Sequence, residues 1–152
     1  MARTASAAAV VSLAPEATLK LWTDFRRWPS FIEGFARPLD VSEGWPAEGS
    51  KVVWESIPGG RGRVTEKVVE SGTGRFATEI FEEALYGTQS LRASEDAEGT
   101  LVELSLDYEL TSYGPLRALA DVLFIRRALR DALRRTLRRF AVEAEEESRA
   151  LS

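Results

Sequence analysis

The chain of 152 residues has the length of one domain, expected over residues 1–152, and can bury a sizeable core. Its formal net charge of −4 gives no overall attraction to nucleic acid or to an anionic membrane. Because it has no cysteine and no histidine, disulfide scaffolds, thiolate metal sites, thiol nucleophiles and Ser-His-Asp catalysis are excluded.

The chain begins with an expected strand at Thr4–Leu13. The apolar run Ala7–Val11 follows a single Arg3 and is too short for a signal peptide. No apolar stretch approaches the roughly 20 residues of a membrane span. These features favour a cytoplasmic protein with no stable membrane insertion.

Two short helices are expected next. Pro15 suits a first helical turn, and apolar residues recur at helical spacing from Leu19 to Phe25. Trp28-Pro29 is expected to break this helix, because the residue before a proline avoids the α region. Ser30 then caps a second short helix over Phe31–Phe35.

Between these helices and Thr111 the apolar period becomes two, which is typical of strands. Glycine- and proline-rich turns separate most of the segments, and such short links favour antiparallel hairpins. The expected strands are Leu39–Ser42, Ser50–Ile57, Gly62–Ser71, Arg75–Ala84, Tyr86–Ser94 and Thr100–Thr111.

The last strand alternates most regularly and leads to a long amphipathic helix. Its apolar positions are Val102, Leu104, Leu106, Tyr108 and Leu110. After Tyr113-Gly114-Pro115 a helical period holds for roughly thirty residues, about 45 Å. Its apolar stripe is Leu116, Leu119, Val122, Leu123, Leu129, Leu133, Leu137, Phe140 and Ala144.

The order of elements predicts an α+β fold. A curved antiparallel sheet of six or seven strands would wrap around the long C-terminal helix, with two short helices after the first strand. Sheet and helix would diverge toward one end and enclose an apolar cavity. This geometry favours the binding of a small hydrophobic molecule.

Several motifs support a family resemblance: Ala14-Pro15-Glu16, Leu21–Phe31, Gly62-Arg63-Val64, Gly99–Leu104 and Gly114-Pro115-Leu116. In these motifs and in element order, nearly the whole chain resembles the START-like (SRPBCC) helix-grip superfamily, and within it the polyketide cyclase/dehydrase family. The resemblance implies the helix-grip fold. It says less about activity, because one fold hosts many functions.

The resemblance to aromatase/cyclases also implies positions for their pocket residues. A tryptophan of the Trp-Pro element corresponds to Trp28, and a further tryptophan falls near Gln89. A mid-sheet strand supplies Trp, Ser and Arg in those enzymes, and these fall at Lys67, Val69 and Ser71. The arginine credited with orienting the polyketide is therefore unmatched, and enzymatic activity stays an open question.

Eight residues are candidates for lining the cavity, with plain core packing as the alternative for each aromatic residue. Tyr108 stands out because a buried phenol needs a hydrogen-bond partner. Thr88 is a weaker polar candidate. The candidates are Trp28, Phe31, Trp54, Gln89, Leu104, Leu106, Tyr108 and Leu123.

Charged and glycine-rich segments have less specific interpretations. A glutamate facing the cavity would have a raised pKa, but the solvated outer face is the more common place for Glu66, Glu79, Glu82 and Glu83. The loop Gly59–Gly62 indicates a hairpin turn, since it lacks the Lys-Ser/Thr pair of a phosphate loop. The dense arginines of the last helix favour a solvated face, with Asp131 able to pair one turn away with Arg127 and Arg135.

These observations favour a carrier or sensor of a polyketide-, lipid- or isoprenoid-like molecule. A polyketide cyclase/dehydratase-type enzyme is the alternative, and a protein or RNA interaction module using the Arg-rich helix is a second one. We expect no cofactor, no metal site and no nucleic-acid partner. Catalytic residues and the oligomeric state remain open.

Overall fold

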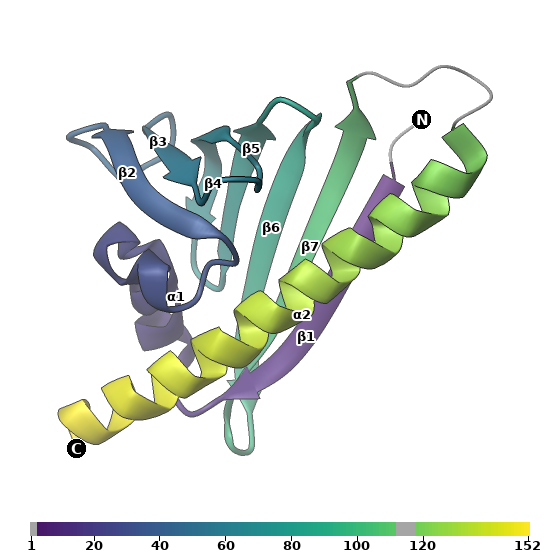
Figure 1. Cartoon of the computed structure of the whole chain (residues 1–152). Coiled ribbons are helices and arrows are strands. Elements are labelled where there is room, and N and C mark those ends of the chain that lie inside the picture. Colours follow the sequence, from purple (N-terminus) through teal and green to yellow (C-terminus); the bar gives the residue numbers. More distant parts are fainter. Residues whose placement is uncertain (1–2, 112–117) are drawn as a thin grey trace.

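A computed structural model describes the backbone of residues 3–111 and 118–152, and the side chains of residues 3–111 and 124–152. Seven strands form one antiparallel sheet in the order β1-β7-β6-β5-β4-β3-β2, and a long helix lies across it (Figure 1). The strands are β1 (Arg3–Val11), β2 (Phe35–Val41), β3 (Lys51–Ser56), β4 (Arg63–Gly72), β5 (Arg75–Phe81), β6 (Leu85–Asp96) and β7 (Gly99–Leu110).

The strands follow one another as hairpins, except that β1 lies at the far edge beside β7. Arg3 pairs with Tyr108 and Val11 with Thr100, so the first strand runs along the whole of the last one. The alternation predicted for β7 is confirmed, because Val102, Leu104, Leu106 and Tyr108 are all buried. One face of the sheet is thus covered.

Helix α2 (Ala118–Leu151) covers that face and runs diagonally in front of β1, β7 and β6 (Figure 1). The predicted stripe is confirmed where side chains are described: Leu133, Leu137, Phe140 and Ala144 are buried against the sheet and short helices. The expected helix start at Leu116 lies outside the described residues.

The two short helices differ from the prediction. Helix α1 (Pro15–Thr23) is confirmed, but the second is a 3-10 helix, η1 (Phe25–Ser30), and contains Pro29. The Asp24 carboxylate caps it by accepting from the Arg26 backbone N–H at 3.2 Å. The expected helix Phe31–Phe35 is wrong, because Gly34 takes a positive φ of 74° and turns the chain into β2.

Strand β2 also starts at Phe35, before the expected Leu39. Its pairing with β3 shifts register between Phe35 and Arg37 and again between Pro38 and Asp40. Each bulge interrupts the alternation of faces, so no period of two marks this strand in the sequence. The other predicted strands are confirmed, with small differences at their ends.

Aromatic side chains fill the space where the short helices meet α2. The Phe31 ring lies 5.0 Å from Phe140 and 5.5 Å from Trp22, between centroids. The Trp28 ring packs edge-on against Phe35 and Trp45, and its indole N–H donates to the Trp22 carbonyl at 2.8 Å. This packing makes one end of the sheet–helix interface solid.

Candidate ligand pocket

A pocket of about 290 Å³ lies between the sheet and the middle of α2. This is near the low end of the ~300–1,000 Å³ range of small-molecule sites, and above the ~150 Å³ cavity that holds benzene in another protein. Strands β3, β4, β6 and β7 form one wall, α2 the other, and the loops after η1, β3 and β5 the rim. The lining residues are Trp22, Ile32, Glu33, Gly34, Trp54, Ile57, Gly60, Arg61, Glu66, Glu82, Gln89, Leu104, Leu106, Ala128, Leu129, Ala132, Leu133 and Thr136.

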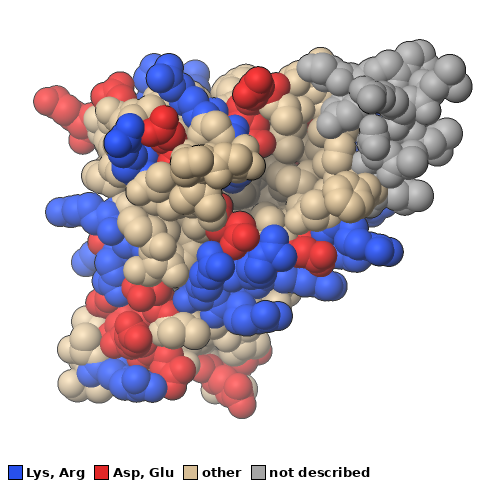
Figure 2. Space-filling model, in the orientation of Figure 1, with Lys and Arg blue, Asp and Glu red and all other residues tan. Residues whose placement is uncertain are grey.

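Small residues on the helix create this space. Ala128 and Ala132 are one turn apart on the lining face of α2, flanked by Leu129 and Leu133. Ala132 is half-buried, and a larger side chain there would reduce the space of the pocket. Figure 2 shows this face of the molecule hollowed, with basic side chains gathered along the helix beside the hollow.

A buried carboxyl group, that of Glu66, belongs to the sheet wall. It is 6% exposed and accepts hydrogen bonds from the Trp54 indole N–H at 2.7 Å and from the Thr78 hydroxyl at 3.0 Å. Burial raises the pKa of Glu66 above its usual range, an effect opposed by the Trp54 hydrogen bond, the Arg61 charge and the Thr78 hydrogen bond. The pocket wall therefore contains a carboxyl group whose neutral form is favoured by burial.

An ion pair stands beside that carboxyl group. The Arg61 guanidinium contacts one Glu82 carboxylate oxygen through Nε at 2.6 Å and Nη2 at 2.5 Å. The same guanidinium carbon lies 5.1 Å from the centroid of the Trp54 ring, in a cation–π arrangement. Arg61, Glu66 and Glu82 thus form one charged cluster in the pocket wall beside Trp54.

The faces of the mid-sheet glutamates differ from the prediction. Glu66 and Glu82 line the pocket, whereas Glu83 is exposed and Glu79 has the opposite parity to buried Thr78 and Ile80. The expectation of a solvated outer face is therefore wrong for two of the four. Indole and guanidinium partners replace the water that these two carboxylates would otherwise have.

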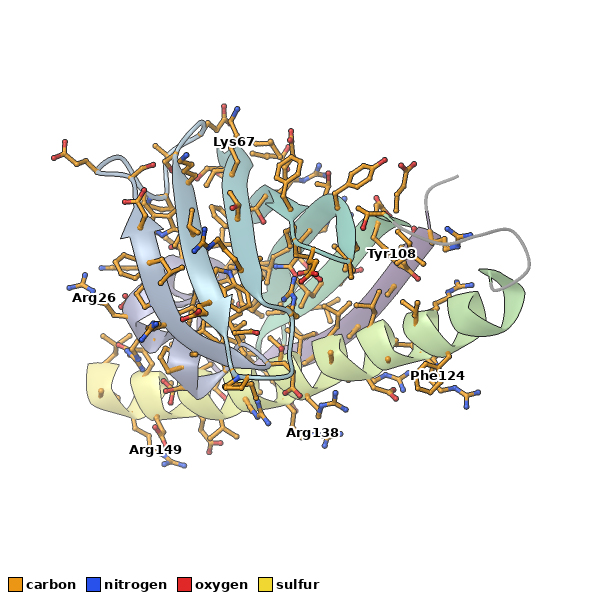
Figure 3. The ribbon with its side chains drawn as sticks, turned by 45° about the horizontal axis from the view of Figure 1, so that its top comes forward. Arg26, Lys67, Tyr108, Phe124, Arg138 and Arg149 are labelled. Atoms are coloured by element: carbon orange, nitrogen blue, oxygen red, sulfur yellow. The ribbon has the colours of Figure 1, made fainter. Side chains whose placement is uncertain are left out.

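The strand positions matched to the cyclase Trp, Ser and Arg also need correction. Lys67, Val69 and Ser71 are exposed, and Figure 3 shows Lys67 projecting away from α2. The buried positions of β4 are Val64, Glu66 and Val68, and a bulge follows Val68. Those three positions therefore do not line the pocket. The guanidinium group in the pocket wall belongs to Arg61 instead.

The structure places the eight predicted site residues in different surroundings. Trp54, Gln89, Leu104 and Leu106 line the pocket together. Trp28 and Phe31 belong to the aromatic packing beside it and are not in its wall. The side chain of Leu123 lies outside the described residues, although its backbone belongs to α2.

Tyr108 is buried on β7, and its hydroxyl has no hydrogen-bond partner among the described residues. Burial raises the pKa of this phenol, while the charges of Arg3 and Arg126 oppose the rise. It does not appear in the wall of the pocket.

Gly87, the register partner of Tyr108 on β6, allows close approach of the two strands, because a Cβ there would lie 2.0 Å from the Asp107 carbonyl oxygen.

The arginines of α2 divide into two groups. Arg135 and Arg139 pair with Glu33 at 3.1 and 2.8 Å, so the predicted Asp131–Arg135 pair does not form. Arg149 pairs with Glu145 at 2.8 Å. The remaining ones are exposed and have no ion pair within the described part of the chain; Figure 3 shows Arg138 pointing away from the sheet. They are Arg126, Arg127, Arg130, Arg134 and Arg138.

Sequence reasoning missed Arg61, Glu33, Ala128 and Ala132 as pocket residues. The predicted hairpin turn at Gly59–Gly62 gives Arg61 no role in the pocket, and Glu33 falls in the predicted helix Phe31–Phe35, which does not form. The two alanines carried a signal, because they stand beside the leucine stripe where larger residues would fill the interface. Among the described residues no acidic cluster fits a metal ion, and no helix combines the length and apolarity that a bilayer crossing requires.

Solved structures share this architecture. The Zhui aromatase/cyclase from a Streptomyces species superposes with a TM-score of 0.75 and 18% identity, over 100% of this chain and 99% of that one. Protein TTHA0849 from Thermus thermophilus superposes with a TM-score of 0.73 and 17% sequence identity, over 99% of both chains. The di-domain aromatase/cyclase StfQ of the steffimycin pathway superposes with a TM-score of 0.74 and 15% sequence identity, over 97% of this chain and 52% of that one.

At these identities the structural likeness establishes the helix-grip fold. A search of curated proteins found no match. A family model described as polyketide cyclase/dehydrase and lipid transport matches residues 2–145, nearly the whole sequence. The chain therefore belongs to the polyketide cyclase/dehydrase and lipid transport family.

Proposed function

We propose that this protein binds a small, largely hydrophobic molecule non-covalently in the pocket, as a carrier or sensor. The observation that carries the proposal is the pocket itself, which combines apolar lining residues with a few polar groups. That combination is typical of small-molecule sites, because apolar area supplies affinity and the polar groups fix orientation. Family membership supports a ligand-binding or cyclase role.

A pocket-filling variant tests the proposal. Ala132→Phe places a ring in the space between α2 and the sheet, whereas Ala150→Phe on an exposed position of α2 is the matched control. A panel of aromatic, sterol and acyl compounds is screened by thermal unfolding. A ligand at 100 times its dissociation constant should stabilise the protein by about 2.7 kcal/mol.

We expect at least one class to stabilise the wild type and the control, but not Ala132→Phe. Silence across the panel, or equal stabilisation of all three proteins, would overturn the proposal.

A second candidate is a cyclase-type enzyme, and the buried carboxyl group of Glu66 specifically favours it. As a carboxylate, Glu66 would take a proton from the carbon between two carbonyls of a bound poly-β-ketone. That carbon would then attack a third carbonyl of the chain, and the alkoxide formed would recover the proton from Glu66. Holding the chain folded would supply much of the rate.

Turnover distinguishes this candidate from a carrier. In the enzyme, Glu66→Gln would abolish cyclisation and retain binding, because glutamine keeps the shape but cannot shuttle the proton. Equal conversion of a poly-β-ketone with wild type, variant and buffer would leave only the carrier.

A further inference from the structure

We infer that the pocket selects an uncharged ligand and excludes carboxylates and other anions of the same shape. The inference rests on the proposed function, and it concerns which hydrophobic molecules the pocket accepts. It follows from the way in which the charges in the wall compensate one another. Fatty acids and similar free acids would then be poor ligands, whereas ketones, alcohols and esters would be good ones.

The first step is that the only cation in the described wall is already neutralised. Arg61 makes two contacts of 2.5–2.6 Å to one oxygen of Glu82, whose side chain is 5% exposed. The face of its guanidinium lies over the Trp54 ring. An anionic ligand would have to compete with a buried carboxylate for this arginine.

The second step is that Glu66 adds negative charge or none. With Glu66 protonated, the set Arg61, Glu82 and Glu66 is neutral; with Glu66 ionised, it carries one net negative charge. In neither state does the set attract an anion. A desolvated carboxylate without a cationic partner is strongly disfavoured in such surroundings.

The rim does not reverse this balance. Glu33 faces the pocket and pairs with Arg135 and Arg139, whose side chains are half exposed, so water screens their charge. Gln89 adds an amide on the sheet wall, which can donate to a carbonyl and accept from a hydroxyl. The polar side of the pocket therefore suits a neutral hydrogen-bonding group.

Two dyes with the same aromatic skeleton test the inference. N-Phenyl-1-naphthylamine is uncharged, and 8-anilinonaphthalene-1-sulfonate is its sulfonated analogue; both fluoresce when they enter an apolar site. Titrations are run at pH 7 in 0.5 M NaCl, which suppresses attraction to the exposed arginines of α2. Signal remaining in Ala132→Phe is subtracted as binding outside the pocket.

For the wild type we expect the neutral dye to bind at least about tenfold more tightly than the sulfonate. Glu82→Gln leaves Arg61 uncompensated, so the preference for the neutral dye over the sulfonate should fall about tenfold. Glu83→Gln, on an exposed neighbour, should leave this preference unchanged. The wild-type ratio tests the inference even if Glu82→Gln does not fold.

Equal affinity of the wild type for the two dyes, or tighter binding of the sulfonate, would overturn charge selection and leave the proposed function standing. Absence of pocket binding by both dyes would overturn both.

Discussion

Replacing Glu66 by glutamine should change how stability depends on pH. Glutamine has nearly the same shape, its carbonyl can accept from the Trp54 indole N–H, and its amide can donate to the Thr78 hydroxyl oxygen. Both hydrogen bonds are thus retained. What the variant loses is the cost of ionising a buried carboxyl group.

The sign follows from the raised pKa of Glu66 in the folded protein. Above the unfolded value of about 4.3, the unfolded chain releases its proton while the folded protein keeps it. Wild-type stability therefore falls as pH rises, by at most about 1.4 kcal/mol per pH unit, until the folded pKa is passed. Glu66→Gln lacks this loss.

Urea unfolding followed by tryptophan fluorescence between pH 4.5 and 8.5 measures the effect. The variant should gain stability relative to the wild type as pH rises, and the difference should level off above the folded pKa. Parallel stability curves, or a difference that shrinks with rising pH, would refute the assignment of Glu66 as a buried acid with a raised pKa.

Three further substitutions test the packing around the pocket, each measured by urea unfolding. Arg27→Ala removes ion pairs of 2.6 and 2.9 Å to two glutamates of α2 and should cost about 1 kcal/mol, with a smaller loss at high salt. Gly87→Ala forces a Cβ onto the β7 backbone and should cost about 1–3 kcal/mol, whereas Gly72→Ala meets nothing within 4 Å and should cost less. Phe140→Ala should cost about 3–5 kcal/mol, and Phe124→Ala, at a 74% exposed position, almost nothing. Equal effects within either matched pair, or an unchanged Arg27→Ala, would contradict this packing.

Much of the fold could be predicted because its strongest signals are long and regular. The alternation of β7 and the leucine stripe of α2 each arise from one buried face, and that face sets the residue types directly. The start of α1 at Pro15 could be predicted for a similar reason, because proline at a first helical turn is a local signal. The element from Phe25 to Ser30 was not, because a six-residue 3-10 helix has no period to detect.

The polar half of the pocket could not be predicted from local pattern. Glu66 is buried only because Trp54 and Thr78 reach it from neighbouring strands, and those partners depend on register. The inward side chains of β4 are Val64, Glu66 and Val68, so the matched odd-numbered positions, one residue out of phase, lie on the outer face. The Arg61 side chain is oriented by the loop between β3 and β4, and a loop has no apolar periodicity from which that orientation could be predicted.

Trp28 and Phe31 illustrate a related difficulty. Both are buried aromatic residues next to the pocket, and the sequence alone cannot distinguish a pocket wall from the packing behind it. The distinction arises from α2, where alanines leave space at 128 and 132 while Phe140 fills it further along.

The central claim is that a small molecule enters the space beside Trp54, and the indole N–H signals in an NMR titration test it most directly. The indole of Trp54 lies in the pocket wall, whereas those of Trp28 and Trp45 donate to backbone carbonyls of Trp22 and Thr23. On addition of N-phenyl-1-naphthylamine, the Trp54 signal should shift strongly and saturably while the Trp28 and Trp45 signals stay nearly fixed. An unmoved Trp54 signal at saturating dye, or equal shifts of all three, would contradict the account.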